Sequence, residues 1–391
     1  MHELLKNRNL QILFAVTLMV VMGVSSIIPV LPTLIKVFDL TPETIGLVLT
    51  TFTLPGVLFT PVFGVLADRV GRKKILIPAL LVFGIAGAAC ALVRNWELLL
   101  LLRFVQGTGA AAFGMINITI IGDLFSGTRR TAALGLNASI LSVGTAVYPA
   151  VGGALAILGW YFPFALPLAA IPLALIVLWH LDNPEPDGGE SLGDYFRNAA
   201  GQMRSRQALG LFLCTLGTFI LLYGPFITFF PILLDTRFQA TAPQIGLLIS
   251  AASFITAIAA SQLGRLAAHF SELCLLRSAF VFYGLAFAII PFFTSFAWLL
   301  VPALLFGAAQ ALSIPNVMSL LNDIATPRTR AAFMAANGTL LRLGQTLAPL
   351  CMGGIFALGG LRAVFWSGTL LAACLFLLTH LLLRPQCGPQ S

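Results

Sequence analysis

The chain has 391 residues, of which 59% are hydrophobic and only 9% are charged, and its mean hydropathy is +0.97. A soluble domain carries about 25% charged residues, so this composition excludes a water-soluble globular protein and predicts an all-α membrane protein. The net charge of +8 does not indicate nucleic-acid binding, because the basic residues are distributed by membrane side and do not gather on one face. We expect them to set the topology and to contact anionic membrane lipids.

Apolar runs long enough to cross a bilayer follow one another along the whole chain. A helix needs about 20 apolar residues to cross the hydrocarbon core, and helices are expected because open strand edges would leave backbone groups unpaired in lipid. Twelve transmembrane helices are predicted, near 10–35, 44–67, 75–93, 97–123, 131–158, 162–181, 208–234, 243–263, 275–294, 297–323, 331–357 and 361–383.

The Lys and Arg residues orient these spans. With both termini on one side, 16 of the 22 basic residues lie on that side, four lie on the other, and Arg103 and Arg342 fall within spans. Lys and Arg near span ends are retained on the cytoplasmic side. We therefore expect both termini to be cytoplasmic.

An internal repeat and one polar stretch divide the chain. The stretch Asp182–Gln207 is rich in Pro, Gly and charge, and its second part could form a short helix on the membrane surface. A shift of 200 positions superposes residues such as Thr41, Gly64, Asp123, Arg130, Asn137, Gly144, Pro149 and Gly153 on identical residues of the second half. We predict an N-terminal six-helix bundle over 1–181, a cytoplasmic linker over 182–207 and a C-terminal six-helix bundle over 208–391.

The short turn between the second and third spans combines one acid, four bases and two glycines. Its sequence, GVLADRVGRKKIL from Gly64 to Leu76, resembles the loop between the second and third helices of major facilitator superfamily transporters. An ordinary basic turn would explain the bases but not the acid or the glycines. The residues of this gating motif are Gly64, Asp68, Arg69, Gly71, Arg72 and Lys73, joined by Asp123 at the end of the fourth span on the same membrane side.

The resemblance implies a fold and a mechanism. In that family two six-helix bundles, related by a pseudo-twofold axis, enclose a substrate site near mid-membrane and rock to give alternating access. Opposite charges at helix ends, such as Asp68 and Arg72, would latch one conformation, and the family's acid also meets a positive helix N-terminus. The second half has Ala268 for the acid and Glu272 for the arginine, so we expect the latch on one side only.

An arginine inside the fourth span should face protein or water, because its insertion costs roughly 2.5–3.5 kcal/mol at a helix centre. Arg103, Gln106 and Asn117 recur at helical spacing and share a face. The stretch LLRFVQGTGAAAF around them resembles the fourth-helix motif of the drug:proton antiporter branch, which ties Arg103 to proton coupling. The alternative is a structural arginine that bridges helices.

The fifth span carries the stretch GTAVYPAVGG, which resembles the fifth-helix motif of the same antiporter branch. Tyr148 stands where that pattern has glycine, so it would loosen the helix contact or point into the cavity. A bent helix without an antiport role is the alternative. The residues expected to bend or closely pack the fifth span and its twin in the eleventh are Gly144, Pro149, Gly153, Gly344 and Pro349.

Further polar residues within spans are candidates for the substrate or coupling cavity, although a residue of this kind taken alone more often forms a hydrogen bond between helices. They are Tyr223, Gln310, Asn316, Arg342 and Gln345. The 14 acids, in contrast, all fall at span ends or in loops. Proton coupling would therefore need a rim acid such as Asp123, Asp235 or Glu97.

Two buried cations without a buried carboxylate argue against a pump for cationic drugs. We predict a secondary transporter of the bacterial inner (plasma) membrane that exports lipophilic neutral, zwitterionic or anionic small molecules, with protons as a candidate coupling ion. A uniporter or importer of organic anions or lipid-like molecules is the alternative, and a non-transporting receptor or scaffold is a second one. The sequence has no nucleotide-binding loop, metal cluster or nucleophile–base pair, so we expect a monomer that is not an enzyme and has no cofactor.

Overall fold

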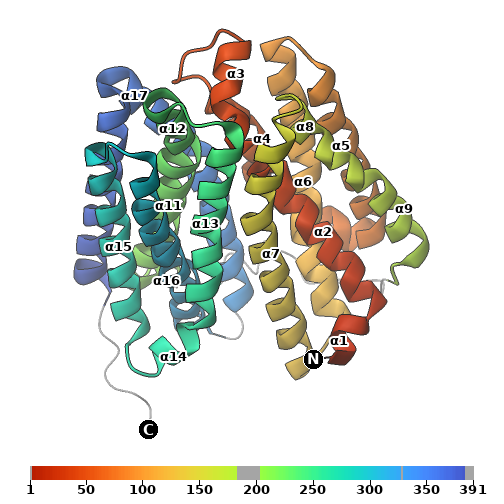
Figure 1. Ribbon diagram of the computed structural model, residues 1–391. Helices are drawn as coiled ribbons and strands as arrows, with labels where there is room; N and C mark the ends of the chain where they lie inside the picture. Colours follow the sequence, from red (N-terminus) through yellow and green to blue (C-terminus); the bar gives the residue numbers. More distant parts are fainter. Residues whose placement is uncertain (1, 183–202, 327–328, 384–391) are drawn as a thin grey trace. The chain divides into compact units, whose positions relative to one another are not determined.

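The computed structural model describes residues 2–182, 203–326 and 329–383, and within these ranges all regular structure is helical (Figure 1). The chain divides into two compact units. The first unit comprises residues 1–189 and 230–253, and the second comprises residues 190–229 and 254–391. The short helix expected in the linker lies mostly outside the described residues, and the division into two six-helix domains stays a prediction.

The first unit is built from the first six predicted spans and the outer parts of the next two. Its helices are α1 (His2–Lys6), α2 (Arg8–Ser25), η1 (Ile28–Val30), α3 (Leu31–Val37), α4 (Leu47–Val70), α5 (Arg72–Leu92), α6 (Trp96–Leu124), α7 (Gly127–Leu155), α8 (Phe162–Ala165), η2 (Leu166–Ala169), α9 (Ala170–His180), α12 (Phe230–Phe238) and the start of α13 (Ala242–Ser261).

The second unit holds the remaining helices. They are α11 (Arg206–Leu221), the π-helix η3 (Leu222–Phe229), the end of α13, α14 (Leu263–Ala267), α15 (Glu272–Ile289), η4 (Ile290–Phe292), η5 (Phe296–Leu299), α16 (Leu300–Ile324) and α17 (Arg330–Leu382).

The all-helical membrane fold is confirmed, although the helices divide differently from the twelve predicted spans. Ten described helices are long and apolar enough to cross a membrane, and α4, bent by 54° between Thr60 and Val62, gives an eleventh. The last two predicted spans form the single element α17. Gly360 interrupts α17 at φ 64° and ψ −162°, a conformation that glycine adopts without a Cβ clash. The predicted boundary between these two spans therefore appears as a break at one glycine.

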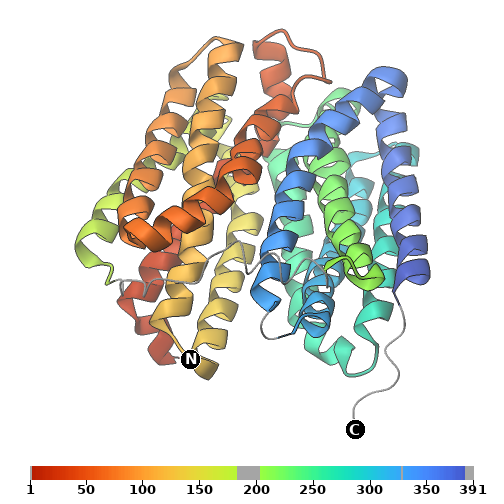
Figure 2. The same cartoon turned by 180° about the vertical axis from the view of Figure 1, so that it is seen from behind.

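Small residues let α6 approach its neighbours closely in the first unit. In Figure 2 this face of the unit shows α4 and α5, both of which contact α6. A Cβ at Gly107 would collide with the Phe52 carbonyl of α4, and one at Gly109 would lie 2.5 Å from the Ala79 carbonyl of α5. Close helix contact through small residues is how membrane helices gain packing energy without a hydrophobic driving force. Gly107 thus lets α6, which carries Arg103, approach the backbone of α4 closely.

In the second unit, α17 packs against α11 and η3. A Cβ at Gly344 would lie 2.8 Å from the Leu216 carbonyl, and Gly224 meets Ala348 and Met352. The π-helix contains Pro225, which has no N–H to donate. The Thr228 hydroxyl donates to the Tyr223 carbonyl, five residues earlier, at 2.6 Å. This irregular turn lies on the same helix as Tyr223, one of the predicted cavity residues.

Candidate functional site

The predicted gating motif forms an ion-pair cluster at the inner end of the first unit, meaning the end predicted to be cytoplasmic. Gly71 separates α4 from α5 at φ 108°, so the chain turns sharply between the acid and the next arginine. Arg72 is 8% exposed and forms ion pairs with Asp123 of α6 and, at 3.4 Å, with Asp68. The acid that ends α4 and the acid at the end of α6 therefore share one buried guanidinium.

The other motif residues have different environments. Lys73 donates to the Leu181 carbonyl at 3.0 Å, which caps the C-terminus of α9 where the polar linker begins. Arg69 is exposed, and Gly64 gives room to the Met115 side chain of α6. The contact of Lys73 with a carbonyl more than a hundred residues away has no signal in the sequence.

The equivalent region of the second unit lacks this cluster. Glu272 occupies the position of Arg72 at the 200-residue shift, and its Oε1 accepts a hydrogen bond from Ser319 at 2.6 Å. Ser319 lies one turn before Asp323, the counterpart of Asp123. Among the described residues, neither Glu272 nor Asp323 forms an ion pair within 4.0 Å.

Arg103 lies in the interior of the first unit, where it is 1% exposed and joins three helices. Its Nη1 donates to the Gly23 carbonyl at 2.9 Å and to Gln106 Oε1 at 2.7 Å, and its Nε donates to the Val48 carbonyl at 3.3 Å. The guanidinium also lies 4.2 Å from the centre of the Phe52 ring. A carboxylate is not among its contacts in the described part of the chain.

The end of α2 explains why a carbonyl is available for Arg103. The last carbonyls of a helix have no intrahelical N–H partner and carry a partial negative charge. α2 ends at Ser25, and the Ser26 N–H and hydroxyl both return to the Met22 carbonyl. The adjacent Gly23 carbonyl accepts from the guanidinium. Backbone oxygen thus offsets much of the cost of burying this charge.

Asn117, on the same helix as Arg103, belongs to a separate polar network. Its Nδ2 donates to Thr17 Oγ1 of α2 at 2.6 Å, and that hydroxyl donates to Asn137 Oδ1 of α7 at 2.6 Å. All three side chains are buried. The structure therefore brings Arg103 with Gln106, and Asn117 with Thr17, into two distinct clusters within the first unit.

The predicted fifth-helix motif lies within α7, which continues through Pro149 to Leu155. The ring of Tyr148 lies beside Gly144 of the same helix and is partly exposed. The N–H of Ala150 donates to the Ser250 hydroxyl of α13 at 3.0 Å. A Cβ at Gly153 would lie 2.6 Å from the Ala242 carbonyl. Glycine at this position therefore allows close packing of α7 on α13.

The acids predicted as proton carriers are partnered or exposed. Asp235, at the outer end of α12, pairs with Lys36 of α3 at 2.7 Å. Asp123 pairs with Arg72, and Glu97 is exposed in the first turn of α6. Each lies near a helix end, as the sequence indicated.

Arg342 lies on α17 and has a different environment from Arg103. Its Nη1 donates to Gln345 Oε1 at 3.3 Å, one helical turn further along, and the side chain is partly exposed. The Tyr223 hydroxyl lies near both Gln345 and the guanidinium. Within the described residues, Arg342 has no ion pair with a carboxylate. The guanidinium therefore has spare hydrogen-bond donors and an uncompensated charge, which is the chemistry of an anion site.

The remaining predicted cavity residues bond within the second unit. Gln310 lies 3.5 Å from the Thr256 hydroxyl, and Asn316 donates to the Leu312 carbonyl of its own helix at 2.6 Å. Asn316 is 2% exposed, so its amide is used locally. No group of three or more His, Cys, Asp and Glu side chains among the described residues could hold a metal ion.

Comparison with known proteins identifies transporters of one superfamily. The sequence profile of the Major Facilitator Superfamily matches residues 13–237 and 208–389. The Bacillibactin exporter of Bacillus subtilis (strain 168) is 34% identical over 164 residues, which cover 40% of this chain and 41% of the exporter. Multidrug resistance protein 1 of the same organism is 26% identical over 359 residues, or 90% of each chain.

A solved structure shows the same fold. The crystal structure of a bacterial homolog to the human lysosomal transporter Spinster, in an inward-facing and unoccupied conformation, superposes with a TM-score of 0.75. The two chains are 20% identical, and the match covers 97% of this chain and 98% of that one.

The contacts of Arg103 predict a structural role that can be measured. Arg103→Ala should lower the free energy of unfolding by about 1–3 kcal/mol, because it leaves a buried carbonyl and Gln106 without their charged donor. Arg103→Lys should recover part of this loss. Thermal unfolding of the purified protein provides the measurement. Arg129→Ala is the control, because Arg129 is exposed and its ion pair with Glu3 contributes little. Equal stability of the Arg103→Ala variant and the control would contradict the role.

Proposed function

Because the chain belongs to the Major Facilitator Superfamily, we propose that this multi-pass membrane protein, a secondary transporter of small molecules and not an enzyme, exports lipophilic anionic, zwitterionic or neutral compounds. One observation carries the substrate preference. Arg342 is a partly exposed cation within a span, and Gln345 is its hydrogen-bond acceptor while no described carboxylate neutralises it. A charge held in apolar surroundings attracts a counter-charge strongly, so an anionic group of a substrate complements it.

The direction of transport rests on the relatives. The matched proteins include an exporter and a multidrug resistance protein, which supports export as the direction for this chain. The scarcity of basic residues on the predicted outer side supports a bacterial inner (plasma) membrane location with both termini cytoplasmic. The protein works as a monomer in this proposal.

Arg103 of the first unit and Arg342 of the second unit have different roles in this proposal. Arg103 bonds through Nε and Nη1 to two backbone carbonyls and Gln106, so it holds α2, α4 and α6 together. Arg342 keeps donors available, and its bond to Gln345 orients it. The ion-pair cluster of Asp68, Arg72 and Asp123 controls the inner end of the first unit during alternating access.

A uniporter or importer of organic anions is the second candidate function. It is favoured by the fact that two of the three acids predicted to carry protons, Asp123 and Asp235, already have basic partners. A non-transporting receptor would tolerate loss of the gating cluster. The variants and conditions below separate these functions.

Replacing Arg342 tests the substrate preference. Arg342→Gln should weaken binding of lipophilic anions by about 10- to 100-fold, the loss of one charge-assisted hydrogen bond, and change neutral compounds of similar shape by less than about threefold. Binding to the purified protein and uptake into proteoliposomes provide the measurements. Arg362→Gln, which removes an exposed charge from the same helix, should leave both classes unchanged. Equal losses for anions and neutral compounds would contradict the proposal.

Replacing Asp68 tests the gating role. Asp68→Asn should reduce turnover by about tenfold, because Arg72 loses one of its two acidic partners, while ligand affinity stays near the wild-type value. Lys74→Gln changes an exposed charge in the same turn and serves as the control. Wild-type turnover in the Asp68→Asn protein would remove the gating assignment. Failure of the wild type itself to transport would favour the receptor alternative.

A proton gradient distinguishes antiport from uniport. Antiport predicts that proteoliposomes accumulate a lipophilic anion faster when protons flow down their gradient in the direction opposite to the anion. Asp123→Asn or Asp235→Asn should abolish this acceleration. The measurement is initial uptake at matched and unmatched pH across the vesicle membrane. Uptake that ignores pH on both sides would contradict proton coupling and favour the uniporter.

A further inference from the structure

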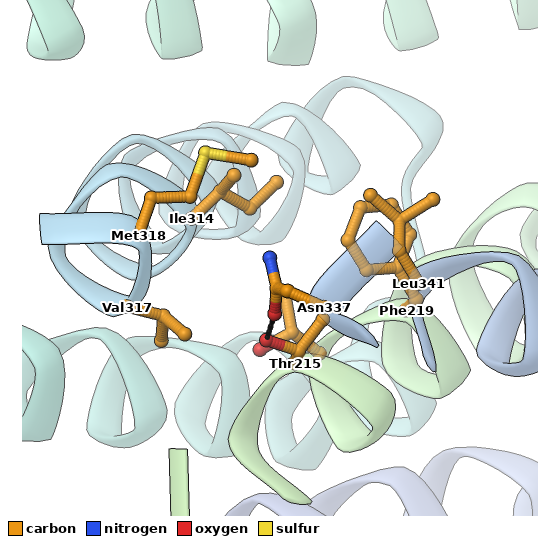
Figure 3. A pocket seen from close by; sticks show the side chains of 8 residues that line it. Thr215, Phe219, Ile314, Val317, Met318, Asn337 and Leu341 are labelled. Carbon is orange, nitrogen blue, oxygen red and sulfur yellow. Dashed lines mark hydrogen bonds between the residues drawn. The ribbon is translucent and has the colours of Figure 1, made fainter. Parts of the chain in front are cut away.

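A small cavity with a few polar side chains in a mainly apolar lining lies inside the second unit, between α11, α16 and α17 (Figure 3). Its volume is about 10 Å³, and a single water-sized group needs about 10–15 Å³ of such space. Charged residues are absent from its lining, which consists of Thr215, Thr218, Phe219, Ile314, Val317, Met318, Asn337 and Leu341. Arg342, Gln345 and Tyr223 are not among its lining residues.

The cavity has hydrogen-bonding groups that its own walls do not satisfy. The hydroxyl of Thr218 is buried and has no partner in the described part of the chain. Thr215 donates to Asn337 Oδ1 at 2.5 Å, and Figure 3 shows the Asn337 amide nitrogen pointing away from Thr215 into the space beside Met318. Buried polar groups without a partner are costly, by about the desolvation free energy of the group. A bound polar group would remove that cost.

The first unit shows which side-chain group occupies the equivalent space. There Thr17 donates to Asn137, just as Thr215 donates to Asn337. The third member of that network is Asn117, whose amide donates to the threonine at 2.6 Å. At the 200-residue shift Asn117 corresponds to Val317, which is part of the cavity wall. The cavity therefore lies where the first unit has a carboxamide of its own.

We propose that this cavity binds one neutral hydrogen-bonding group that donates to Thr215 Oγ1 and accepts from Asn337 and Thr218. Water, an alcohol and a primary carboxamide all have this combination of donor and acceptor. Ionised groups are excluded, because the lining offers no counter-charge. The resident group is a water molecule or the polar end of a transported compound, and the second source rests on the proposed transport function.

Two nearly isosteric substitutions test the chemistry of the site. Val317→Asn fills the cavity with the amide that the first unit uses, and Val317→Leu fills it with an apolar group of similar volume. The proposal predicts that the midpoint of thermal unfolding of the full-length protein stays at or above wild type for Val317→Asn. For Val317→Leu it should fall by about 2–4 °C, because the polar walls lose their partner. Equal midpoints for the two variants would overturn the proposal.

Thr218→Val gives a test that does not depend on filling the cavity. If a resident group bonds with Thr218, removing the hydroxyl should lower the midpoint. If the hydroxyl has no partner, removing it should raise the midpoint, because a buried unsatisfied group disappears. A higher midpoint for Thr218→Val would therefore contradict the proposal even if Val317→Asn failed to fold.

A probe compound distinguishes the two sources of the resident group. 2-Naphthamide and 2-methylnaphthalene share an apolar body and differ in the carboxamide. If 2-naphthamide alone stabilises the wild type and does not stabilise Val317→Asn, the site accepts the polar end of an organic compound. If wild type and Val317→Asn respond alike, or neither responds, the resident is water. Both results are consistent with the proposed site and differ only in the source of the resident group. These stability measurements do not depend on whether Arg342 takes part in anion transport.

Discussion

A guanidinium placed among apolar helices must find oxygen atoms or an open surface, because a bare charge in a low-dielectric interior is not tolerated. The chain contains two such arginines within its predicted spans, whereas its acids lie at span ends or in loops. Arg103 uses the carbonyls of Gly23 and Val48 together with Gln106. Arg342 has the Gln345 oxygen and a partly exposed position. Arg103 therefore bonds within the helix bundle, and in the proposed function Arg342 is the arginine available to a ligand.

The repeat shows that equivalent positions in the two halves carry side chains of different chemistry. At the 200-residue shift, Gln106 becomes Phe306, whose ring stacks on Phe226 with centroids 3.8 Å apart. The polar cluster of the first unit is thus replaced by an aromatic core in the second. Arg72 likewise becomes Glu272, so the pairing of a cation with Asp123 has no equivalent there among the described residues. In the proposed function, charge for gating and charge for binding are therefore assigned to different halves.

The sequence predicted features that depend on composition and local pattern. Apolar runs of about 20 residues located the helices, and the gap before residue 361 anticipated the break at Gly360. Spacing and span polarity also placed Asp68, Arg72 and Asp123 at the same membrane side, and the structure brings them into one cluster. A single 53-residue element in place of the last two spans was not predicted, because a glycine break without a polar loop resembles a short turn in sequence.

The sequence did not predict the contacts with backbone carbonyl oxygens or the position of the cavity. The carbonyls that bind Arg103 and Lys73 depend on how helix ends are oriented, and no residue type encodes them. The π-helical turn near Tyr223 and the cavity beside Val317 have the same origin, since each arises from how three helices fit together. The 200-residue shift did contain one usable signal, the exchange of Asn117 for Val317 beside a retained asparagine.

The most direct measurement is the position of a bound anion. A structure of the protein with 6-bromo-2-naphthoate, located by the anomalous signal of bromine, would show which arginine meets the ligand. The account predicts that the carboxylate lies about 2.7–2.9 Å from the Arg342 guanidinium, the usual distance for a charge-assisted hydrogen bond. A carboxylate bound elsewhere, with Arg342 unoccupied, would contradict the assignment of this arginine to the substrate.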